Sequence, residues 1–248
     1  MEATSALVAR LDAQAGSQTA LERLAALRAA LPGPVTFTTS FGIEDQAITH
    51  LIATAGLDIA FATLDTGRLF LQTYDVWART EARYGIRVRA FFPQASAIEQ
   101  LVDAQGVNGF YETVEARKAC CDARKLEPLG RALAGAQGWV TGLRADQSDH
   151  RQGLAFVSHD AGRGLIKLNP IFDWSRADAA AFTAANNVPV NALHAEGFLS
   201  IGCAPCTRAV AAGEPERAGR WWWEDEAKKE CGLHVGPDGR LTRAGVPA

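Results

Sequence analysis

Residues 35–45 read VTFTTSFGIED, and the architecture of the chain follows from this stretch. Residues 35–39 are β-branched or aromatic, which is typical of a buried strand. Residues 40–45 form a polar turn around Gly42, and residues 45–55 continue with the apolar spacing of a helix. A strand, a turn and a helix in this order make the first part of a βαβ unit. The stretch therefore predicts an α/β protein with a parallel sheet.

The same alternation continues on both sides of this unit. Leucines at helical spacing predict an N-terminal helical segment that ends before Pro32. Downstream, strands are expected at 59–64, 87–91 and 139–142, and helices at 69–84 and 115–133. Two further runs, 154–158 and 165–168, are expected to pair as a hairpin, and Ser175 to cap a helix over 175–187. Together these elements predict a doubly wound, mostly parallel sheet.

The length and composition fit one α/β domain with a tail. A chain of 248 residues with 48% hydrophobic residues can bury one substantial core. The periodic pattern weakens after Gly202. We therefore expect an α/β nucleotide-binding domain over residues 1–209 and a loop-rich C-terminal tail over residues 210–248.

The charge and hydropathy patterns exclude several classes of partner. With 25 Lys and Arg against 28 Asp and Glu, the net charge of −3 offers no general attraction to nucleic acid or to an anionic membrane. An anionic ligand must then be held by a local group of basic side chains. The N-terminus lacks the pattern of a signal peptide, and no run of roughly 18 apolar residues occurs, so we expect a cytoplasmic protein without membrane spans.

The turn after the first expected strand is a candidate site for an anion. In open α/β sheets, ligands bind at the carboxyl ends of the strands, where helix N-termini present free N–H groups. Thr39 and Ser40 supply hydroxyl groups there, and Gly42 lets the backbone approach a ligand. The turn lacks GxGxxG and the Walker lysine, which favours a nucleoside monophosphate group over a hydrolysed triphosphate. The alternative is an ordinary turn in which Ser40 or Asp45 caps the helix.

Four of the five cysteines form two close pairs. Cys120 and Cys121 are adjacent, and Cys203 and Cys206 are separated by two residues. In a reducing compartment such pairs indicate a metal site rather than disulfides. Adjacent thiolates suit a [4Fe-4S] cubane, which distributes its ligands over four irons, better than one small zinc ion, although zinc stays an alternative. A redox dithiol at Cys203 and Cys206, and inert buried thiols, are weaker alternatives.

The fifth cysteine, Cys231, is a candidate nucleophile. Lys228, Lys229 and His234 lie close to it in the sequence. Positive charge nearby favours the thiolate, which is the form that attacks an electrophile. A lone cysteine in a tail is more often incidental, so this interpretation depends on the other motifs.

Several segments resemble the motifs of one enzyme family. Residues 230–234 read ECGLH, residues 39–45 read TSFGIED, residues 64–68 read LDTGR, and residues 141–148 read TGLRADQS, followed by Arg151. In this order they resemble the sulfonucleotide reductases, which reduce APS or PAPS. The two cysteine pairs match the branch of that family that binds a [4Fe-4S] cluster. The resemblance extends from about residue 35 to residue 234.

The resemblance implies a fold, a reaction and a set of site residues. The fold is that of the adenine-nucleotide α-hydrolase-like group. The reaction converts adenylyl sulfate (APS) to sulfite and AMP in assimilatory sulfate reduction, with thioredoxin or glutaredoxin as electron donor. Cys231 is implied as the catalytic residue that forms a thiosulfonate, and Cys120, Cys121, Cys203 and Cys206 as the ligands of the cluster. The implied substrate-binding residues are Thr39, Ser40, Gly42, Asp45, Leu64, Thr66, Lys125, Arg144, Arg217 and Arg220.

Several points stay open at this level. Ala145 stands where the family motif TGxRRxQS has its second arginine, which weakens the case for binding by two guanidinium groups. One phosphate distinguishes PAPS from APS, so use of PAPS or of both is an alternative. A non-catalytic iron-sulfur or zinc sensor is disfavoured, because it needs no fifth thiol such as Cys231. ATP-dependent ligases and tRNA-modifying enzymes are disfavoured as well, because they carry an SGGxDS-like loop and residues 40–45 read SFGIED. The sequence leaves open the oligomeric state, including a homo-oligomer, and which of Trp221, Trp222 and Trp223 closes on the substrate.

Overall fold

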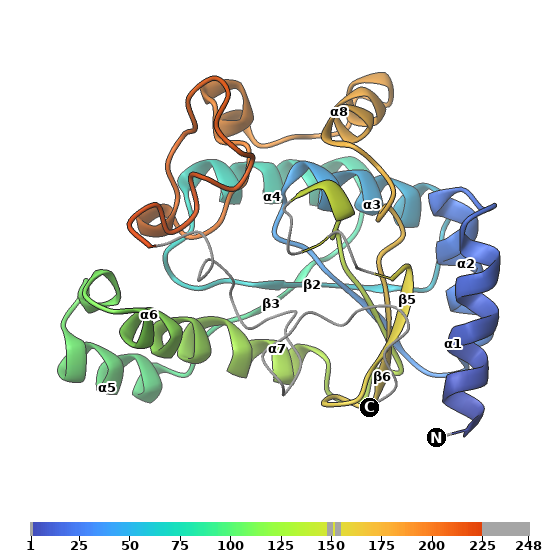
Figure 1. The fold of residues 1–248 in the computed structure, drawn as a ribbon, viewed down its shortest axis with the longest axis horizontal. Coiled ribbons are helices and arrows are strands. Elements are labelled where there is room, and N and C mark those ends of the chain that lie inside the picture. The colour runs from blue at the N-terminus through green and yellow to red at the C-terminus, as the bar shows by residue number, and fades with distance from the viewer. Residues whose placement is uncertain (1, 148–150, 152–154, 225–248) are drawn as a thin grey trace.

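The computed structural model describes residues 2–147, 151 and 155–224. Its centre is a six-stranded sheet with the strand order β3-β2-β1-β4-β6-β5 (Figure 1). Neighbouring strands are parallel except for β5 and β6, which are antiparallel. The strands are β1 (Val35–Thr38), β2 (Ala60–Leu64), β3 (Arg89–Phe91), β4 (Gly138–Val140), β5 (Val157–Asp160) and β6 (Leu165–Leu168). The expected mostly parallel, doubly wound sheet is confirmed.

Helices cover both faces of the sheet, so Val35, Thr36 and Phe37 of the central strand β1 are all buried. α3 (Ile43–Thr54) and α4 (Leu71–Tyr84) lie on one face, and α6 (Val114–Cys121) and α7 (Glu127–Ala132) lie on the other (Figure 1). α5 (Ala95–Gln105), which the sequence pattern does not predict, lies beside α6, and α8 (Arg176–Ala185) packs against α3. Within the described part of the chain, no helix combines the length and apolar character needed to cross a membrane.

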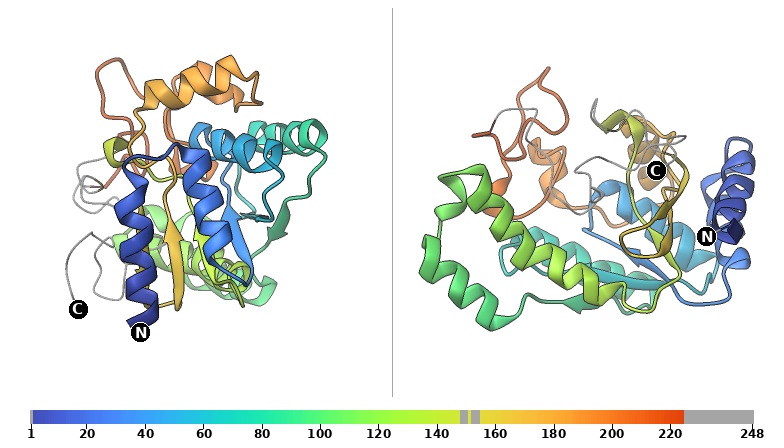
Figure 2. Two further views of the ribbon diagram at one scale, coloured as in Figure 1. Left: turned by 90° about the vertical axis from the view of Figure 1, so that its right-hand side faces the viewer. Right: turned by 60° about the horizontal axis from the view of Figure 1, so that its bottom comes forward.

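The expected N-terminal helical segment consists of α1 (Glu2–Ala15) and α2 (Ala20–Ala30). Thr19 caps α2 through a capping box with Glu22. Figure 2 shows the two helices side by side along the edge of the sheet, and α1 contacts β5 there. The buried leucines of α2 join the main core with Phe37 of β1 and Ile48 of α3.

The other predicted elements are present, with ends that differ by a few residues. The helix expected over 115–133 is interrupted, because a π-helical turn, Asp122–Leu126, joins α6 to α7. Such turns often occur at functional sites, and this one carries Arg124 and Lys125. The predicted hairpin of β5 and β6 is confirmed, and Ser175 caps α8 as expected.

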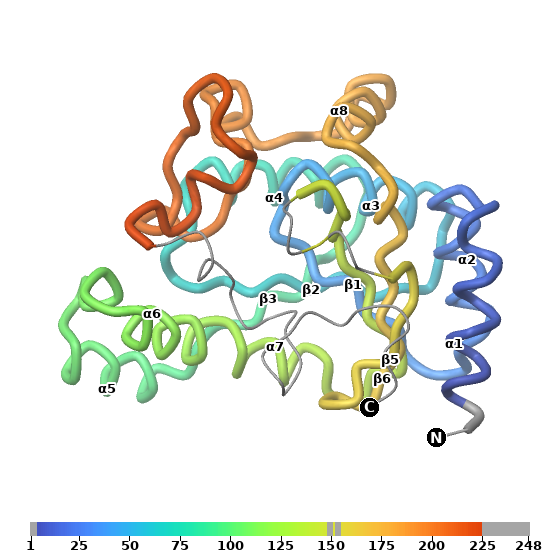
Figure 3. The backbone as a smooth tube through the Cα atoms, viewed as in Figure 1, coloured from blue at the N-terminus to red at the C-terminus, as the bar shows by residue number. Residues whose placement is uncertain are grey.

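The last described segment, residues 207–224, folds back on itself. The backbone N–H of Arg208 bonds to Gly219, and that of Trp221 bonds to Cys206. Figure 3 shows this segment, in orange and red, at the end of the molecule where α6 lies. The division of the chain at residues 209 and 210 stays a prediction, because residues 225–248 lie outside the described residues.

Candidate active site

A cavity of about 210 Å³ lies at the carboxyl ends of β1, β2 and β4. β1 pairs with β2 on one side and with β4 on the other, so the strand order reverses at this point of the sheet. Open α/β sheets bind ligands at such a switch point. Nine of the ten predicted substrate-binding residues line the cavity: Thr39, Ser40, Gly42, Asp45, Leu64, Thr66, Lys125, Arg217 and Arg220.

The loop after β1 presents the N-terminus of α3 to the cavity. Gly42 is the N-cap of α3 and offers no side chain to the first N–H groups of the helix. Phe41 adopts a left-handed conformation with a φ of 59°, which is uncommon for a residue with a side chain. Its ring is buried and stacks on Trp77, with 5.4 Å between the ring centroids. Because a helix N-terminus attracts anions, this loop suits a phosphate group.

Asp45 stabilises this loop through hydrogen bonds with Ser40. Its carboxylate accepts a hydrogen bond of 2.6 Å from the backbone N–H of Ser40 and one of 2.8 Å from Ser40 Oγ. Burial raises the pKa of Asp45 to about 7, although both hydrogen bonds act to lower it. Gly142, after β4, lies against the same carboxyl group, and a Cβ atom there would clash with Asp45 Oδ1. Glycine at this position therefore lets two cavity loops meet.

The loop after β2 connects the cavity to one of the cysteines. Thr66 Oγ1 lies 3.3 Å from Cys203 Sγ, and the carbonyl oxygen of Thr66 accepts a hydrogen bond of 2.7 Å from Arg124. Asp65 orders the turn by accepting a hydrogen bond of 2.8 Å from the N–H of Gly67. The loop is thereby tied to the π-helical turn between α6 and α7.

Three cationic side chains also line the cavity. Lys125 comes from the π-helical turn, and Arg217 and Arg220 come from the C-terminal segment. The guanidinium of Arg220 lies 4.8 Å from the ring centroid of Trp221, and that of Arg217 lies 6.0 Å from it. These cations and the N-terminus of α3 all attract negative groups to the cavity.

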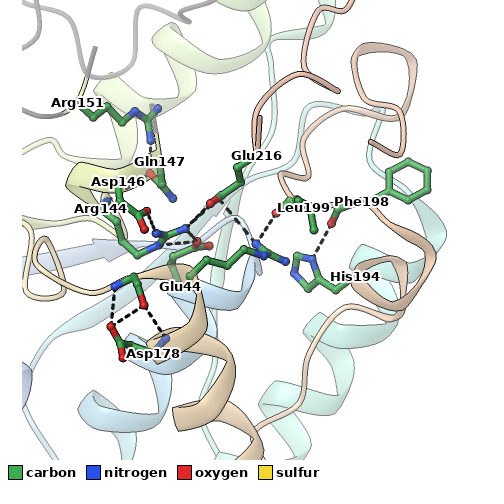
Figure 4. Close-up of polar contacts among 12 residues, drawn as sticks. Glu44, Arg144, Asp146, Gln147, Arg151, Asp178, His194, Phe198, Leu199 and Glu216 are labelled. Atoms are coloured by element: carbon green, nitrogen blue, oxygen red, sulfur yellow. Dashed lines mark hydrogen bonds and ion pairs between the residues drawn. The ribbon is translucent and has the colours of Figure 1, made fainter. Parts of the chain in front are cut away.

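Arg144, the tenth predicted substrate-binding residue, is not among the residues that line the cavity. Its fully buried guanidinium pairs with Glu44 at 2.9 Å and Glu216 at 2.7 Å, and it also contacts Asp146 (Figure 4). Burial raises the pKa of Glu216, and the charge of Glu44 adds to this shift. The arginine joins two walls of the cavity, and its contact with a substrate stays a prediction.

The two cysteine pairs meet in one place. Cys120, Cys121, Cys203 and Cys206 are free thiols that line a second, smaller cavity. The side chains of Arg68, Arg117, Arg124 and Lys125 line it as well. Thiols surrounded by cations fit a group with net negative charge, such as a cluster with four thiolate ligands. Among the described residues, no group of three or more His, Cys, Asp and Glu side chains is arranged to hold a metal ion, so the fit rests on the donor set and its charge.

The surroundings of the thiols differ. Burial by itself would raise the pKa of Cys203, but this pKa is lowered by the charges of Lys125, Arg220 and Arg124 together with a hydrogen bond to Thr66. Burial raises the pKa of Cys206 to about 12, and the neighbouring Cys203 adds to that shift. Cys203, Lys125 and Trp221 line both cavities, so the two cavities share a wall.

The predicted nucleophile, Cys231, lies outside the described residues. Of the three consecutive tryptophans, Trp221 is buried in the shared wall, whereas Trp222 is 40% exposed. Trp223 packs on Tyr111, with 4.4 Å between the ring centroids. The three tryptophans thus have different surroundings, although they are adjacent in the sequence.

The structure adds cavity residues that the sequence analysis does not identify. Glu44, His194 and Glu216 all line the larger cavity, at the carboxyl ends of β1, β2 and β4. The position of Glu44 next to Asp45 in the turn is a signal that could have pointed to it. No local pattern points to His194 or Glu216, because contacts between distant segments bring them to the cavity. Burial lowers the pKa of His194, whose Nδ1 lies 2.8 Å from the carbonyl oxygen of Phe198.

Comparisons with known proteins show the family of the chain. Residues 34–209 match the family model of the phosphoadenosine phosphosulfate reductase domain. The chain belongs to the phosphoadenosine phosphosulfate reductase family. It is 53% identical over 231 residues to the adenosine 5'-phosphosulfate reductase of Agrobacterium fabrum, covering 93% of this chain and 88% of that protein. The protein of the same name from Allochromatium vinosum is 51% identical over 200 residues, covering 81% of this chain and 78% of that protein.

Solved structures place this member of the phosphoadenosine phosphosulfate reductase family in its fold group. The phosphoadenylyl-sulfate reductase of Candida auris, in a phosphate complex, has a TM-score of 0.70 at 25% identity, covering 82% of this chain and 96% of that one. Yeast FAD synthetase has a TM-score of 0.50 at 16% identity, covering 72% of this chain and 59% of that one. The family and the adenine-nucleotide α-hydrolase-like fold are confirmed, and the chain is an oxidoreductase.

Proposed function

We propose that this protein reduces adenylyl sulfate to sulfite and AMP in assimilatory sulfate reduction, with thioredoxin as electron donor. The observation that carries the proposal is the wall shared by the two cavities, where Lys125, Cys203 and Trp221 line both. In this proposal the larger cavity is the nucleotide cavity. A substrate bound there can place its reacting group beside the cationic side chains at that wall. The names of the relatives support adenylyl sulfate as the substrate. The choice of thioredoxin as electron donor is supported by the resemblance of the sequence motifs to those of the family.

The cavity offers a group for each part of this substrate. The N-terminus of α3 binds the 5'-phosphate, and the loop after β2, with Leu64 and Thr66, contacts the nucleoside. Lys125, Arg217 and Arg220 then neutralise the sulfate. This neutralisation matters because an anionic thiolate must approach an anionic sulfate, and the two charges repel each other.

The chemistry proceeds by two attacks on sulfur. The Cys231 thiolate attacks the sulfate sulfur, the bond from sulfur to the bridging oxygen breaks, and AMP leaves with the electron pair. A thiolate of thioredoxin then attacks Cys231 Sγ. Sulfite leaves, and thioredoxin and Cys231 are joined by a mixed disulfide. The second thiol of thioredoxin resolves this disulfide and frees Cys231. Thioredoxin thereby supplies both electrons and is itself oxidised to its disulfide.

In this proposal, Cys120, Cys121, Cys203 and Cys206 hold a [4Fe-4S] cluster. When bound, the cluster adds a local charge of about −2 next to the sulfate end of the cavity. Lys125 lines both cavities, so its ammonium group serves as a countercharge to the thiolates and to the sulfate. We place the reaction in the cytoplasm, where free thiols persist.

The test is anaerobic incubation of the purified protein with adenylyl sulfate, without thioredoxin, followed by intact mass and peptide mapping. A sulfonate-sized gain on Cys231, lost with release of sulfite when thioredoxin is added, is the expected result. The Cys231→Ser protein is the matched control and should gain no mass. Parallel incubation with PAPS compares the two nucleotides. An iron-loaded protein that forms no adduct with either nucleotide would contradict the proposal.

A further inference from the structure

The indole ring of Trp221 lies among three guanidinium groups. Those of Arg117 and Arg220 each lie 4.8 Å from the ring centroid, and that of Arg217 lies 6.0 Å from it. The face of an aromatic ring is negative and attracts cations within about 6 Å. The ring therefore offsets part of the repulsion between three like charges that are gathered in one place.

The three arginines belong to different cavities. Arg217 and Arg220 line the nucleotide cavity, Arg117 lines the cysteine cavity, and Trp221 lines both. Arg117 also donates hydrogen bonds of 2.9 and 2.8 Å to the carboxylate of Glu224, which pairs its charge. The indole is thus the side chain that the cations of the two cavities share.

Trp221 is itself held in a fixed position. Its side chain is buried and packs in a small apolar cluster with Phe110, Cys203 and Cys206. Its backbone N–H donates to the carbonyl oxygen of Cys206 at 3.2 Å, and its φ of 43° is in the left-handed region. A residue with a large side chain keeps such a backbone only where the surrounding structure fixes it. The ring therefore suits a rigid platform better than a lid that opens and closes.

Arg220 is confined by further contacts. Its Nη1 donates to the carbonyl oxygen of Ile201 at 3.3 Å. Its guanidinium also packs so closely on Gly202 that a Cβ atom there would clash with Nη2. Contacts with residues 201 and 202 and with the indole together restrict the rotamers of a long, flexible side chain.

We propose that Trp221 is a positioning residue whose indole holds the guanidiniums of Arg217 and Arg220 in place at the nucleotide cavity before a substrate binds. A cation that is already ordered loses less conformational entropy when it meets an anion, so the anion binds more tightly. The anion is the sulfate at the end of the nucleotide, or a phosphate in its place. This use of the two arginines rests on the proposed function.

Trp222 provides a matched control. It is the next residue in the chain, but it is 40% exposed and is not among the residues that line either cavity. Its ring contacts Tyr111 and Trp223, with 6.2 and 4.8 Å between the centroids. Trp222→Met therefore removes an indole from the same segment and leaves both cavity walls unchanged.

The experiment compares the binding of AMP and ADP to the full-length, iron-loaded protein by titration calorimetry. ADP carries a β-phosphate where adenylyl sulfate carries its sulfate, and AMP carries neither group. The ratio of the two Kd values therefore separates the cations from the rest of the cavity. The variants are Trp221→Met, Trp221→Phe, Trp222→Met, the double variant Arg217→Met/Arg220→Met, and the triple variant that adds Trp221→Met to it. Iron content is measured for each.

We expect Trp221→Met to bind AMP within about threefold of the unmodified protein and ADP at least tenfold more weakly. Trp221→Phe keeps a smaller ring and should lose less affinity for ADP. In the absence of both arginines, replacement of Trp221 should change the Kd of ADP less than twofold, because the indole acts through these cations. Trp222→Met should behave like the unmodified protein.

Three results would overturn the inference. In the first, Trp221→Met weakens AMP and ADP equally, so the indole supports the nucleoside or the wall in general. In the second, both Trp221 variants bind ADP within twofold of the unmodified protein. In the third, the triple variant loses as much again as Trp221→Met does alone. If Trp221→Met loses iron, Trp221→Phe decides the question, because it keeps an aromatic ring in the wall.

Failure of the proposed function gives a different result. If the double variant Arg217→Met/Arg220→Met keeps the ratio of Kd values of the unmodified protein, these cations do not hold the terminal anion, and the sulfate contacts of the proposed function are overturned together with the inference. Calorimetry with AMP and ADP uses neither Cys231 nor thioredoxin. An unmodified protein that forms no adduct but shows the expected ratios would overturn the reaction and keep the platform.

Discussion

The guanidinium of Arg144 donates hydrogen bonds of 2.9 and 2.7 Å to the carboxylate of Glu216, which lies 72 residues further along the chain. The same nitrogen donates to Glu44 at 2.9 Å (Figure 4). Arg144 therefore connects the helix after β1, the loop after β4 and the C-terminal segment. Arg217, the next residue after Glu216, lines the nucleotide cavity, so this connection also locates a predicted sulfate-binding cation.

Replacement of Arg144 by Ala should destabilise the protein strongly. The substitution leaves the carboxylates of Glu44 and Glu216 close together in a buried place, and loss of one partner of a buried pair costs about 3–5 kcal/mol. Urea denaturation measures the change in the free energy of unfolding. Arg87→Ala is the control, because the Arg87 side chain is 90% exposed in its pair with Glu81 and should contribute less than about 1 kcal/mol. A stable Arg144→Ala protein with only a raised KM would instead indicate a pure substrate contact.

Replacement of Gly142 by Ala should weaken nucleotide binding. The added Cβ would clash with Asp45 Oδ1, and Asp45 holds Ser40 in the phosphate loop. Displacement of a binding group by about 1 Å can cost about a hundredfold, so we expect AMP affinity to fall at least tenfold in titration calorimetry. Gly130→Ala on α7 has open space for its Cβ and should bind AMP normally and gain up to about 1 kcal/mol of stability. Equal affinities in the two variants would contradict the prediction.

The pKa of Asp45 predicts a pH dependence of stability. Burial raises this pKa from 3.8 to about 7, so the carboxyl group binds its proton more tightly in the folded state than in the unfolded state. The resulting stabilisation is complete below about pH 4 and is lost as the pH rises through about 7. Between about pH 5 and pH 8, the free energy of unfolding should fall more for the unmodified protein than for Asp45→Asn. Denaturation curves with the same pH dependence in both proteins would refute this.

Single cysteine substitutions should separate the metal site from the nucleophile. Anaerobically prepared protein should hold about four irons per chain if the four thiols bind a cubane. Cys121→Ser and Cys203→Ser should lower the iron and sulfide content and the visible absorbance. Cys231→Ser should keep the iron and lose only the adduct with adenylyl sulfate. Full iron content in Cys203→Ser would show that the cluster is held elsewhere, and bound zinc would favour the alternative metal.

Much of the fold is predictable from the sequence because it depends on local patterns. The run of β-branched and aromatic residues at 35–38, the turn at Gly42 and the capping residue Ser175 act within a few neighbouring residues. Each element is found where these signals predict. The π-helical turn at Asp122–Leu126 is an exception, since the apolar spacing of a helix does not reveal an extra residue in one turn.

The candidate site is predictable only in part. The loops after β1 and β2 lie at the carboxyl ends of strands, so the topology alone brings them together. Glu216 and Glu44 lie 72 and 100 residues from Arg144, and Glu224 lies 107 residues from Arg117. No spacing rule joins such distant positions. Sequence reasoning could therefore name Arg144 as important but could not find the carboxylates that it holds.

By itself, the sequence determined the order of most helices and strands and the parallel sheet, because hydrogen bonding and periodicity act over short stretches of chain. It also pointed to the turn at residues 40–45 and to the five cysteines as candidate site residues. Only the tertiary structure decided that both cysteine pairs line one cavity, that this cavity shares Lys125 with the nucleotide cavity, and that Arg117 meets Glu224. These contacts arise when distant segments are buried together. The charged side chains of these segments are then paired with opposite charges nearby, because burying a charge without a partner costs free energy.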